Sequence, residues 1–224
     1  MLIPLKDENP TRSFPFITVT FIALNILIFL YQLLSPEGLN YYVLRLGAIP
    51  YEFTHFKTLH FRQDIIPLTT LFTSMFMHGG FFHIIGNMLY LWVFGNNVED
   101  FLGTLKFILF YVLAGLVATF SHVISNPNSK YPLIGASGAI AGVLGAYLVL
   151  FPYARIRTLV FLFFLIRVVD IPAAFFLLFW FFMQVLYAGM GGEVAWFAHI
   201  GGFLFGFLAI RAFIKRRGRR IYYH

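Results

Sequence analysis

Four polar side chains lie inside long apolar segments of this 224-residue sequence, and their types suit acyl transfer: His83, Asn87, Ser137 and His199. A serine hydroxyl is a poor nucleophile until a neighbouring base takes its proton, and neutral histidine is the usual base. Acyl transfer also needs hydrogen-bond donors directed at the developing oxyanion. Ser137 and His199 are therefore candidates for nucleophile and base. His83, Asn87 and the Ser137 amide, at a helix N-terminus, are candidate oxyanion donors.

The positions of these residues place them at a similar depth in a bilayer. At about 1.5 Å per helical residue, Ser137 lies about 27 Å before Arg155, or less because a turn intervenes. His199 lies about 18 Å before Arg211, and His83 about 21 Å before the polar end of its own segment. Polar groups at such depth are costly and usually face a bundle interior or a wet cavity. The sequence therefore predicts a polar site in the outer half of the membrane.

Small residues accompany both candidate catalytic residues. Gly138 follows the serine in a glycine-rich segment, and Gly202 and Gly206 lie three and seven residues after His199, on its helix face. Small residues at this spacing let two helices approach closely in lipid. We therefore expect the helices that carry Ser137 and His199 to pack against each other.

The composition favours a membrane protein. Hydrophobic residues make up 60% of the chain and charged residues 11%, whereas soluble domains are nearer half and a quarter. Because a spanning helix needs about 20 apolar residues, this content suits about six spans. Long apolar runs without alternation exclude an outer-membrane barrel as well as a soluble enzyme. The absence of cysteine excludes a thiol nucleophile, a disulfide framework and a thiolate metal site.

Hydropathy predicts an all-α polytopic fold with six transmembrane helices, at Phe14–Leu34, Phe81–Phe94, Phe107–Ile124, Ser137–Phe151, Pro172–Met190 and Val194–Ile214. The nine residues Thr158–Ile166 are too few to cross, so we expect them to lie at the cytoplasmic interface or to re-enter the membrane. Arg167 and Asp170 are expected to form an interfacial charge pair. Residues 1–13 and the basic residues 215–224 are expected to be cytoplasmic tails around a helical domain, 14–214, with a long outer loop at 35–77.

The basic residues indicate the orientation. With both termini in the cytoplasm, twelve of the 16 Lys and Arg residues lie inside and four outside, as the positive-inside rule requires. The net charge of +7 comes largely from a short tail after the last apolar segment, which is typical of a membrane flank and not of a nucleic-acid surface. We therefore expect a multi-pass protein of a prokaryotic inner or cytoplasmic membrane that does not bind nucleic acid.

Three motifs resemble the rhomboid intramembrane serine proteases. Gly135-Ala136-Ser137-Gly138 is similar to the family's G-x-S-G motif. The segment Ala198–Gly206 resembles A-H-x-x-G-x-x-x-G, and His78–Asn87 resembles H-x4-H-x3-N. A single G-x-S-G is weak evidence, but three motifs in order on the second, fourth and sixth helices are specific. The resemblance covers about residues 69–206.

The resemblance implies a rhomboid-like bundle and a Ser–His dyad without a third acid. Ser137 would be the nucleophile and His199 the base, with His83, Asn87 and the Ser137 amide as the oxyanion hole. Single-span membrane proteins in the bilayer would be the substrates, and no cofactor or metal is implied. His78 would hydrogen-bond the outer loop or waters. Further supporting positions are Gly135, Gly138, Gly202 and Gly206.

Two other functions are consistent with six spans. A catalytically dead relative that binds membrane clients would keep the glycines but lose Ser137 or His199, and both are present. A transporter would need ionisable residues in mid-membrane, which the predicted helices almost lack. Oligomeric state is not indicated by the sequence.

Several other residues have two interpretations. Trp180 and Gln184, four residues apart, could line a substrate gate or anchor the helix at the interface. His55 and His60 favour a solvated loop over a metal site, because they lack tight ligand spacing. Glu99 is expected to brace a helix end or a loop.

Overall fold

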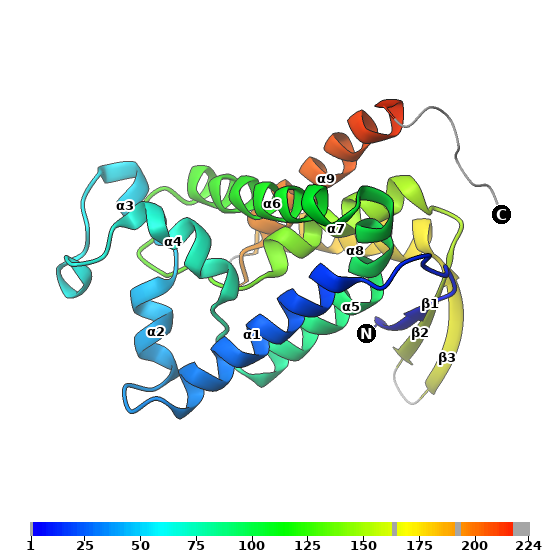
Figure 1. The fold of residues 1–224 in the computed structure, drawn as a ribbon. Coiled ribbons are helices and arrows are strands. Elements are labelled where there is room, and N and C mark those ends of the chain that lie inside the picture. The colour runs from blue at the N-terminus through cyan, green and yellow to red at the C-terminus, as the bar shows by residue number, and fades with distance from the viewer. Residues whose placement is uncertain (1, 163–164, 191–193, 217–224) are drawn as a thin grey trace.

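The computed structural model describes residues 2–162, 165–190 and 194–216 and is mostly helical (Figure 1). The long helices are α1 (Phe16–Leu34), α5 (Phe81–Leu102), α6 (Thr104–Ser125), α7 (Ser137–Leu150), α8 (Ala173–Ala188) and α9 (Trp196–Arg216). Between α1 and α5 lie α2 (Leu39–Leu46), α3 (Pro50–His55), α4 (Pro67–Thr73) and the 3-10 turns η1 (His60–Arg62) and η2 (Ser74–Phe76). The strands are β1 (Leu2–Asp7), β2 (Arg155–Leu162) and β3 (Leu165–Pro172). Each of the six predicted apolar segments coincides with a helix.

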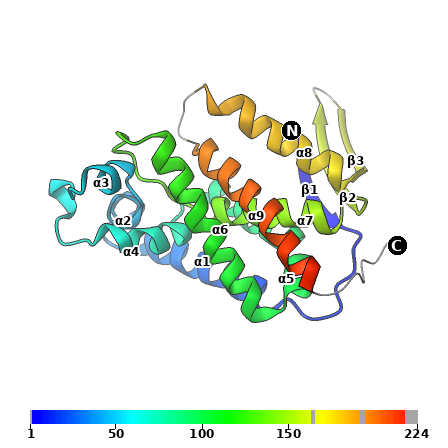
Figure 2. The same ribbon diagram turned by 90° about the horizontal axis from the view of Figure 1, so that it is seen from above.

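Helix α7 is the centre of the bundle. Every residue from Gly138 to Leu148 is buried, because α5, α6, α8 and α9 pack around it (Figure 2). A helix that is apolar on all sides needs such an environment. With 14 residues it is about 21 Å long, shorter than a hydrocarbon core of about 30 Å. If the last residue of α7 lies level with the ends of the longer neighbouring helices, its first residue, Ser137, therefore lies inside the membrane and not at its surface.

Glycines bring α7 and α9 into backbone contact. A Cβ atom at Gly202 would overlap the carbonyl oxygen of Gly138, and one at Gly206 would lie 2.6 Å from the carbonyl carbon of Gly142. On the other side of α7, a Cβ atom at Gly138 would lie 2.6 Å from the Cβ atom of Ala118 in α6. Carbon atoms in contact are normally about 3.5–4.0 Å apart. No larger side chain fits at these positions without separating the helices.

Helix α5 continues to Leu102, eight residues beyond its predicted end at Phe94. Hydropathy stopped there because the last two turns are polar, although they are helical and partly buried. In these turns, Glu99 accepts hydrogen bonds from the backbone N–H groups of Ile17 and Thr18 and from the Thr18 hydroxyl, each at 2.8 Å. The first N–H groups of a helix lack intrahelical partners and attract a carboxylate. The expectation that Glu99 braces a helix end is therefore confirmed.

The chain is mostly helical, as predicted, but it is not all-α, because three strands form an antiparallel sheet in the order β1-β2-β3. The segment Thr158–Ile166, expected to lie at the interface or to re-enter the membrane, is divided between β2 and β3, and its residues 163 and 164 lie outside the described residues. The strands extend beyond the apolar run on both sides, to Arg155 and to Pro172, and β-branched residues favour them.

The register of the hairpin also corrects the predicted charge pair. Asp170 lies opposite Arg157, with Arg157 Nε 3.2 Å from Asp170 Oδ1, whereas Arg167 lies opposite Val160. Glu8 lies 3.5 Å from the same guanidinium. The partner of Asp170 is thus Arg157 rather than Arg167, because side chains pair across strands and not along them.

The N-terminal segment is bonded to the bundle through Asp7 of β1. Its Oδ2 atom accepts hydrogen bonds from Asn97 Nδ2 of α5 at 2.6 Å and from the Tyr147 hydroxyl of α7 at 2.7 Å. Burial raises the pKa of Asp7 to about 6. The segment expected to be a polar tail thus includes a strand that packs on the end of α7 remote from Ser137.

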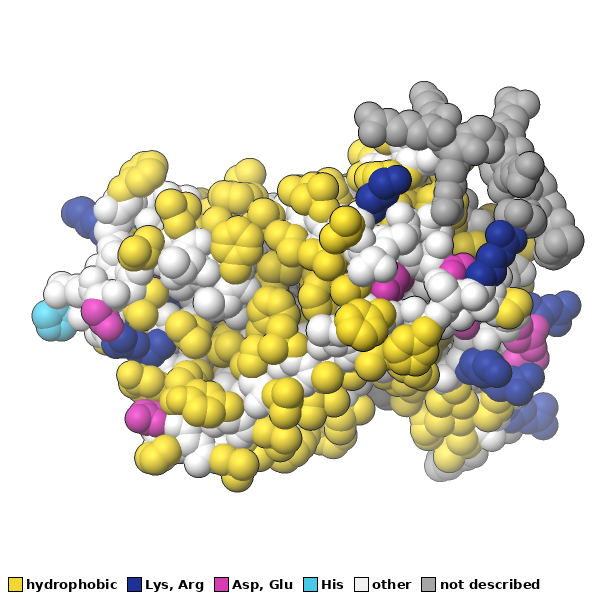
Figure 3. Space-filling view, in the orientation of Figure 1, with side chains coloured by type: hydrophobic (Ala, Val, Ile, Leu, Met, Phe, Trp, Pro, Cys, Tyr) yellow, Lys and Arg dark blue, Asp and Glu magenta, His cyan; other side chains and the backbone are white. Residues whose placement is uncertain are grey.

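The helices have the length and surface of a membrane bundle. Three of them, α1, α6 and α9 to Ile214, are long and apolar enough to cross a membrane, and α7 and α8 are shorter apolar helices. Large apolar side chains such as Phe82, Leu105 and Ile124 are highly exposed. Figure 3 shows apolar side chains across the middle of one face, with most Lys and Arg at the end that carries the sheet. Soluble monomers rarely expose so much apolar surface, so the chain is a multi-pass membrane protein.

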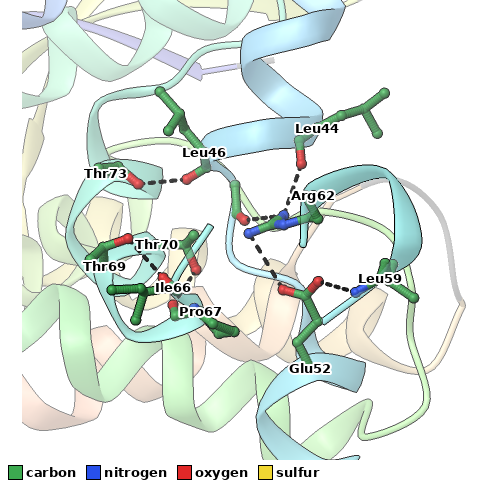
Figure 4. A network of polar contacts seen from close by, with 11 residues as sticks. Leu44, Leu46, Glu52, Leu59, Arg62, Ile66, Pro67, Thr69, Thr70 and Thr73 are labelled. Atoms are coloured by element: carbon green, nitrogen blue, oxygen red, sulfur yellow. Dashed lines mark hydrogen bonds and ion pairs between the residues drawn. The ribbon is translucent and has the colours of Figure 1, made fainter. Parts of the chain in front are cut away.

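The segment from 35 to 77 is folded around a buried ion pair (Figure 4). Arg62 and Glu52 have fully buried side chains, with Arg62 Nη2 3.4 Å from Glu52 Oε2. Arg62 Nη1 also donates to the carbonyl oxygens of Leu44 and Gly47, at 2.8 and 3.0 Å, and so binds the C-terminal end of α2. Glu52 accepts the N–H of Leu59 at 2.9 Å. Buried charges require partners of this kind, and they give the long loop a fixed shape.

Candidate active site

The chain just before α7 is held by the folded 35–77 segment. Ala48 and Leu133 exchange two backbone hydrogen bonds of 2.9 and 2.8 Å, and the N–H of Gly135 donates to the carbonyl oxygen of Ser74 at 2.9 Å. Gly135 has φ +110°, a conformation that side chains disfavour. These contacts fix the point at which α7 begins, and so the position of Ser137, its first residue.

The structure brings Ser137 and His199 together. Ser137 Oγ lies 2.8 Å from His199 Nε2, and the two residues come from α7 and from the first turns of α9. This contact spans two helices whose backbones touch at Gly138 and Gly202, one residue after the serine and three after the histidine. A hydroxyl at this distance from an imidazole nitrogen can pass its proton to that nitrogen.

The other ring nitrogen of His199 contacts α8. His199 Nδ1 lies 2.8 Å from Gln184 Oε1. The rings of Trp180 and Trp196 flank the imidazole, with centroids at 5.8 and 6.2 Å. The sequence suggested Trp180 and Gln184 as gate or anchor residues. It did not predict their contact with His199, although their spacing of four placed both on one helix face.

The candidate oxyanion donors converge beside Gly135. His83 Nδ1 accepts the N–H of Gly79 at 3.3 Å, which leaves the hydrogen of a neutral ring on Nε2. That Nε2 lies 2.7 Å from where a Cβ atom of Gly135 would be, and Asn87 Nδ2 lies 3.6 Å from the same point. The buried Asn87 Nδ2 has no hydrogen-bond partner among the described residues. Two side-chain donors thus lie close to Gly135, two residues before Ser137.

The backbone N–H of Ser137 is a third donor in the same region. As the first residue of α7, Ser137 has no intrahelical acceptor for its N–H, because a helical N–H donates to the carbonyl four residues earlier and that residue lies before the helix. Helix N-termini also favour negative charge. The donors therefore come from α5 and α7, on either side of Gly135.

His78 lies behind this group of donors. Its side chain is fully buried, and its ring meets the His83 ring edge-on, with centroids 5.1 Å apart. Its backbone is held by Gln32 of α1, whose Oε1 accepts the His78 N–H at 3.2 Å and whose Nε2 donates to the carbonyl oxygen at 3.4 Å. This edge-on contact indicates that His78 helps to set the position of the His83 ring.

The two histidines of the long loop make local contacts. The His55 ring stacks on Tyr51 with centroids 4.0 Å apart, and His60 Nδ1 lies 3.3 Å from Gln63 Nε2. Among residues 2–162, 165–190 and 194–216, no three His, Asp or Glu side chains are grouped as metal ligands would be.

Comparison with known proteins gives consistent matches. The family model described as Rhomboid domain matches residues 67–216. The chain is 29% identical over 199 residues to Rhomboid protein 1, mitochondrial, of Saccharomyces cerevisiae, and the match covers 82% of this chain and 55% of that protein. It is 41% identical over 78 residues to Rhomboid protease GluP of Bacillus subtilis, covering 35% of this chain and 15% of that protein.

A third relative is the Presenilin-associated rhomboid-like protein, mitochondrial, of Bos taurus, 39% identical over 85 residues, or 37% of this chain and 22% of that protein. The chain thus spans about half the length of the yeast relative and less of the other two. The domain match, in contrast, covers well over half of this chain and contains Ser137, His199 and both candidate oxyanion side chains. The chain belongs to the rhomboid family.

Proposed function

We propose that this chain is an intramembrane serine endopeptidase that cleaves single-span membrane proteins within or near their transmembrane helix. The observation that carries the proposal is the 2.8 Å contact between Ser137 Oγ and His199 Nε2, beside donors from His83 and Asn87. A serine, a base within hydrogen-bond reach and preorganised donors are the parts that acyl transfer requires.

In this mechanism, His199 takes the proton of Ser137 as Oγ attacks the carbonyl carbon of the scissile peptide bond. The tetrahedral oxyanion is stabilised by His83 Nε2–H, by the Asn87 amide and by the Ser137 N–H. His199 then gives its proton to the leaving amine, and an acyl ester on Ser137 remains. The same histidine next activates a water molecule, which hydrolyses the ester and restores the serine.

The proposed setting is a cell membrane crossed six times, with both termini in the cytoplasm. In Figure 1 the C-terminal end of α9 lies at the end of the molecule that carries β1, and α2 and α3 lie at the opposite end. This supports an even number of crossings. The positive-inside rule places Arg155 and Arg157, which lie in β2, on the cytoplasmic side, and so supports a cytoplasmic location for the end of the molecule that carries the sheet. The mitochondrial names of two relatives make organelle membranes the alternative setting.

The proposal is tested with the full chain reconstituted in liposomes and a fluorescently labelled single-span protein as substrate. Ser137→Ala and His199→Ala should each abolish cleavage above background. Ser125→Ala and His60→Ala are matched controls, because their side chains hydrogen-bond to Ser121 and Gln63, which have no part in the proposed chemistry, and both should cleave as the wild type does. Equal cleavage by all five proteins would overturn the proposal. Binding of the substrate without cleavage would instead favour a client-binding protein.

A further inference from the structure

Gln184 is a buried polar residue in the membrane-facing helix α8. It is 6% exposed, and its Oε1 atom lies 2.8 Å from His199 Nδ1. We propose that Gln184 is a positioning residue that sets the tautomer and orientation of the catalytic base. This inference rests on the proposed function, and it assigns to α8 a part in the chemistry that the resemblance to a two-residue dyad does not contain.

The orientation of the Gln184 amide follows from a second contact. Its Nε2 atom donates to the backbone carbonyl oxygen of Trp180, four residues earlier on α8, at 3.0 Å. A carbonyl oxygen can only accept, so the NH2 group must face Trp180 and the oxygen must face His199. The reversed amide would place two oxygen atoms against each other at Trp180.

The fixed amide determines which nitrogen of His199 carries the hydrogen. Because Oε1 only accepts, His199 Nδ1 must donate, and a neutral imidazole then has its lone pair on Nε2. That lone pair faces Ser137 Oγ at 2.8 Å. The opposite tautomer would present an N–H to the serine and could not take its proton. Gln184 therefore selects the tautomer that a general base needs.

The surroundings of the imidazole limit its rotation. The Trp180 ring lies at 39° to the His199 ring and stacks on Phe203 with centroids 6.0 Å apart, while the Trp196 ring lies edge-on to it at 85°. These aromatic contacts restrict the plane of the ring, but they do not distinguish its two nitrogens. The hydrogen bond from Gln184 supplies that distinction.

No charge is required for this role. The titratable groups that act on His199 from the neighbouring helices are His83 of α5 and His122 of α6. Ser137 of α7 and Gln184 of α8 complete its polar contacts within the described chain. A neutral amide orients the imidazole without the charge that a carboxylate would bring to it.

The burial of Gln184 is otherwise costly. The other buried residues of α8 are Ala173, Phe176 and Leu177, all in its first half, so Gln184 is the buried residue of the half that meets His199. An apolar side chain would fill this place without desolvating an amide, and the two hydrogen bonds of Gln184 offset that cost. A polar residue in such a place indicates a role beyond packing.

Two variants of the full chain separate orientation from packing. Gln184→Met fills the space but cannot accept from Nδ1, so kcat should fall about tenfold with KM within twofold of wild type. Gln184→Glu keeps an oxygen that accepts from Nδ1, and its protonated form can also donate to the Trp180 carbonyl oxygen, so its kcat should stay well above that of the methionine variant. Leu186→Met, on an exposed position of α8, is the control for a change of side chain in this helix and should cleave like the wild type.

The order of the kcat values of the two variants tests the proposal. If Gln184 only packs, the methionine variant should equal or exceed the glutamate variant, and that result would overturn the proposal. So would a methionine variant with wild-type kcat. Loss of all cleavage by the wild type, or cleavage that persists in Ser137→Ala, would overturn the proposed function instead, so the two failures are distinguishable.

A measurement on the wild-type protein avoids any folding defect of the variants. Nitrogen-15 NMR of histidine-labelled protein distinguishes a protonated Nδ1 from a protonated Nε2, and the His199 signals are those missing from His199→Ala. We expect neutral His199 to carry its hydrogen on Nδ1. A neutral ring protonated on Nε2 would overturn the proposal.

Discussion

Replacing Gly206 by alanine tests whether the contact of α7 and α9 positions the proposed catalytic pair, Ser137 and His199. A Cβ atom at Gly206 would lie 2.6 Å from the carbonyl carbon of Gly142 and 2.8 Å from its Cα atom. Carbon atoms in contact are normally about 3.5–4.0 Å apart, so α9 must move away from α7 by about 1 Å. Helix backbones are stiff, and the displacement cannot be absorbed by rotation of a side chain.

The expected effect on activity follows from this displacement. His199 lies two turns before Gly206 on the same helix, so a rigid shift of about 1 Å would lengthen its 2.8 Å contact with Ser137 to roughly 3.8 Å. That distance is beyond a hydrogen bond, and a misplacement of about 1 Å costs on the order of 100-fold in rate. Overpacking should also lower the free energy of unfolding by about 1–3 kcal/mol.

Gly86→Ala is the matched control, because it makes the same change in a helix where a Cβ atom would meet nothing within 4 Å. This variant should keep its thermal stability or gain up to about 1 kcal/mol from the better helix propensity of alanine. Both variants are compared with the wild type in liposomes for cleavage of a single-span substrate and in detergent for thermal unfolding.

The reasoning is refuted if Gly206→Ala cleaves within threefold of the wild type and unfolds at the same temperature. It is also refuted if Gly206→Ala and Gly86→Ala lose activity equally, because the loss would then not depend on the space around the glycine.

Three further predictions concern single side chains. Asn87→Ala should lower kcat on the order of 10²–10³-fold if its amide stabilises the oxyanion, and a loss below threefold in steady-state cleavage would exclude it from that role. Glu99→Gln should lower the free energy of unfolding by about 3 kcal/mol, because it weakens three hydrogen bonds at the start of α1, and an unchanged unfolding midpoint would contradict this. Burial raises the pKa of Asp7 to about 6, so ionisation is disfavoured in the folded protein and wild-type stability should fall by up to about 3 kcal/mol as pH rises from about 4 through 6. Asp7→Asn should remove most of this dependence, and parallel profiles of unfolding temperature against pH would count against it.

The helices were predictable because hydropathy and glycine spacing act locally along the chain. The short length of α7 and the position of Ser137 at its start were both predictable from the sequence. The end of α5 at Leu102 was not predicted, because the residues after Phe94 are polar and hydropathy alone does not show that they continue the helix. A hydropathy window cannot detect polar residues whose hydrogen-bond partners lie on another helix.

The sheet could not be predicted for a related reason. The run Thr158–Ile166 is as apolar as a short membrane segment, and its strand partner β1 lies more than 150 residues away, in a stretch that reads as a polar tail. Gln184 is the corresponding case in the candidate site. Its spacing from Trp180 placed both on one face of α8, but a hydrogen bond to His199 depends on how α8 packs against α9, which no local pattern records.

The central claim is that His199 makes Ser137 a nucleophile, and labelling of the serine tests it most directly. The reconstituted protein is treated with a fluorophosphonate, which reacts with activated serine hydroxyls, and the modified peptide is identified by mass spectrometry. We predict modification at Ser137 in the wild type and its loss in His199→Ala, while the control His60→Ala is modified as the wild type is. Modification at another serine, or equal modification of Ser137 without His199, would contradict the account.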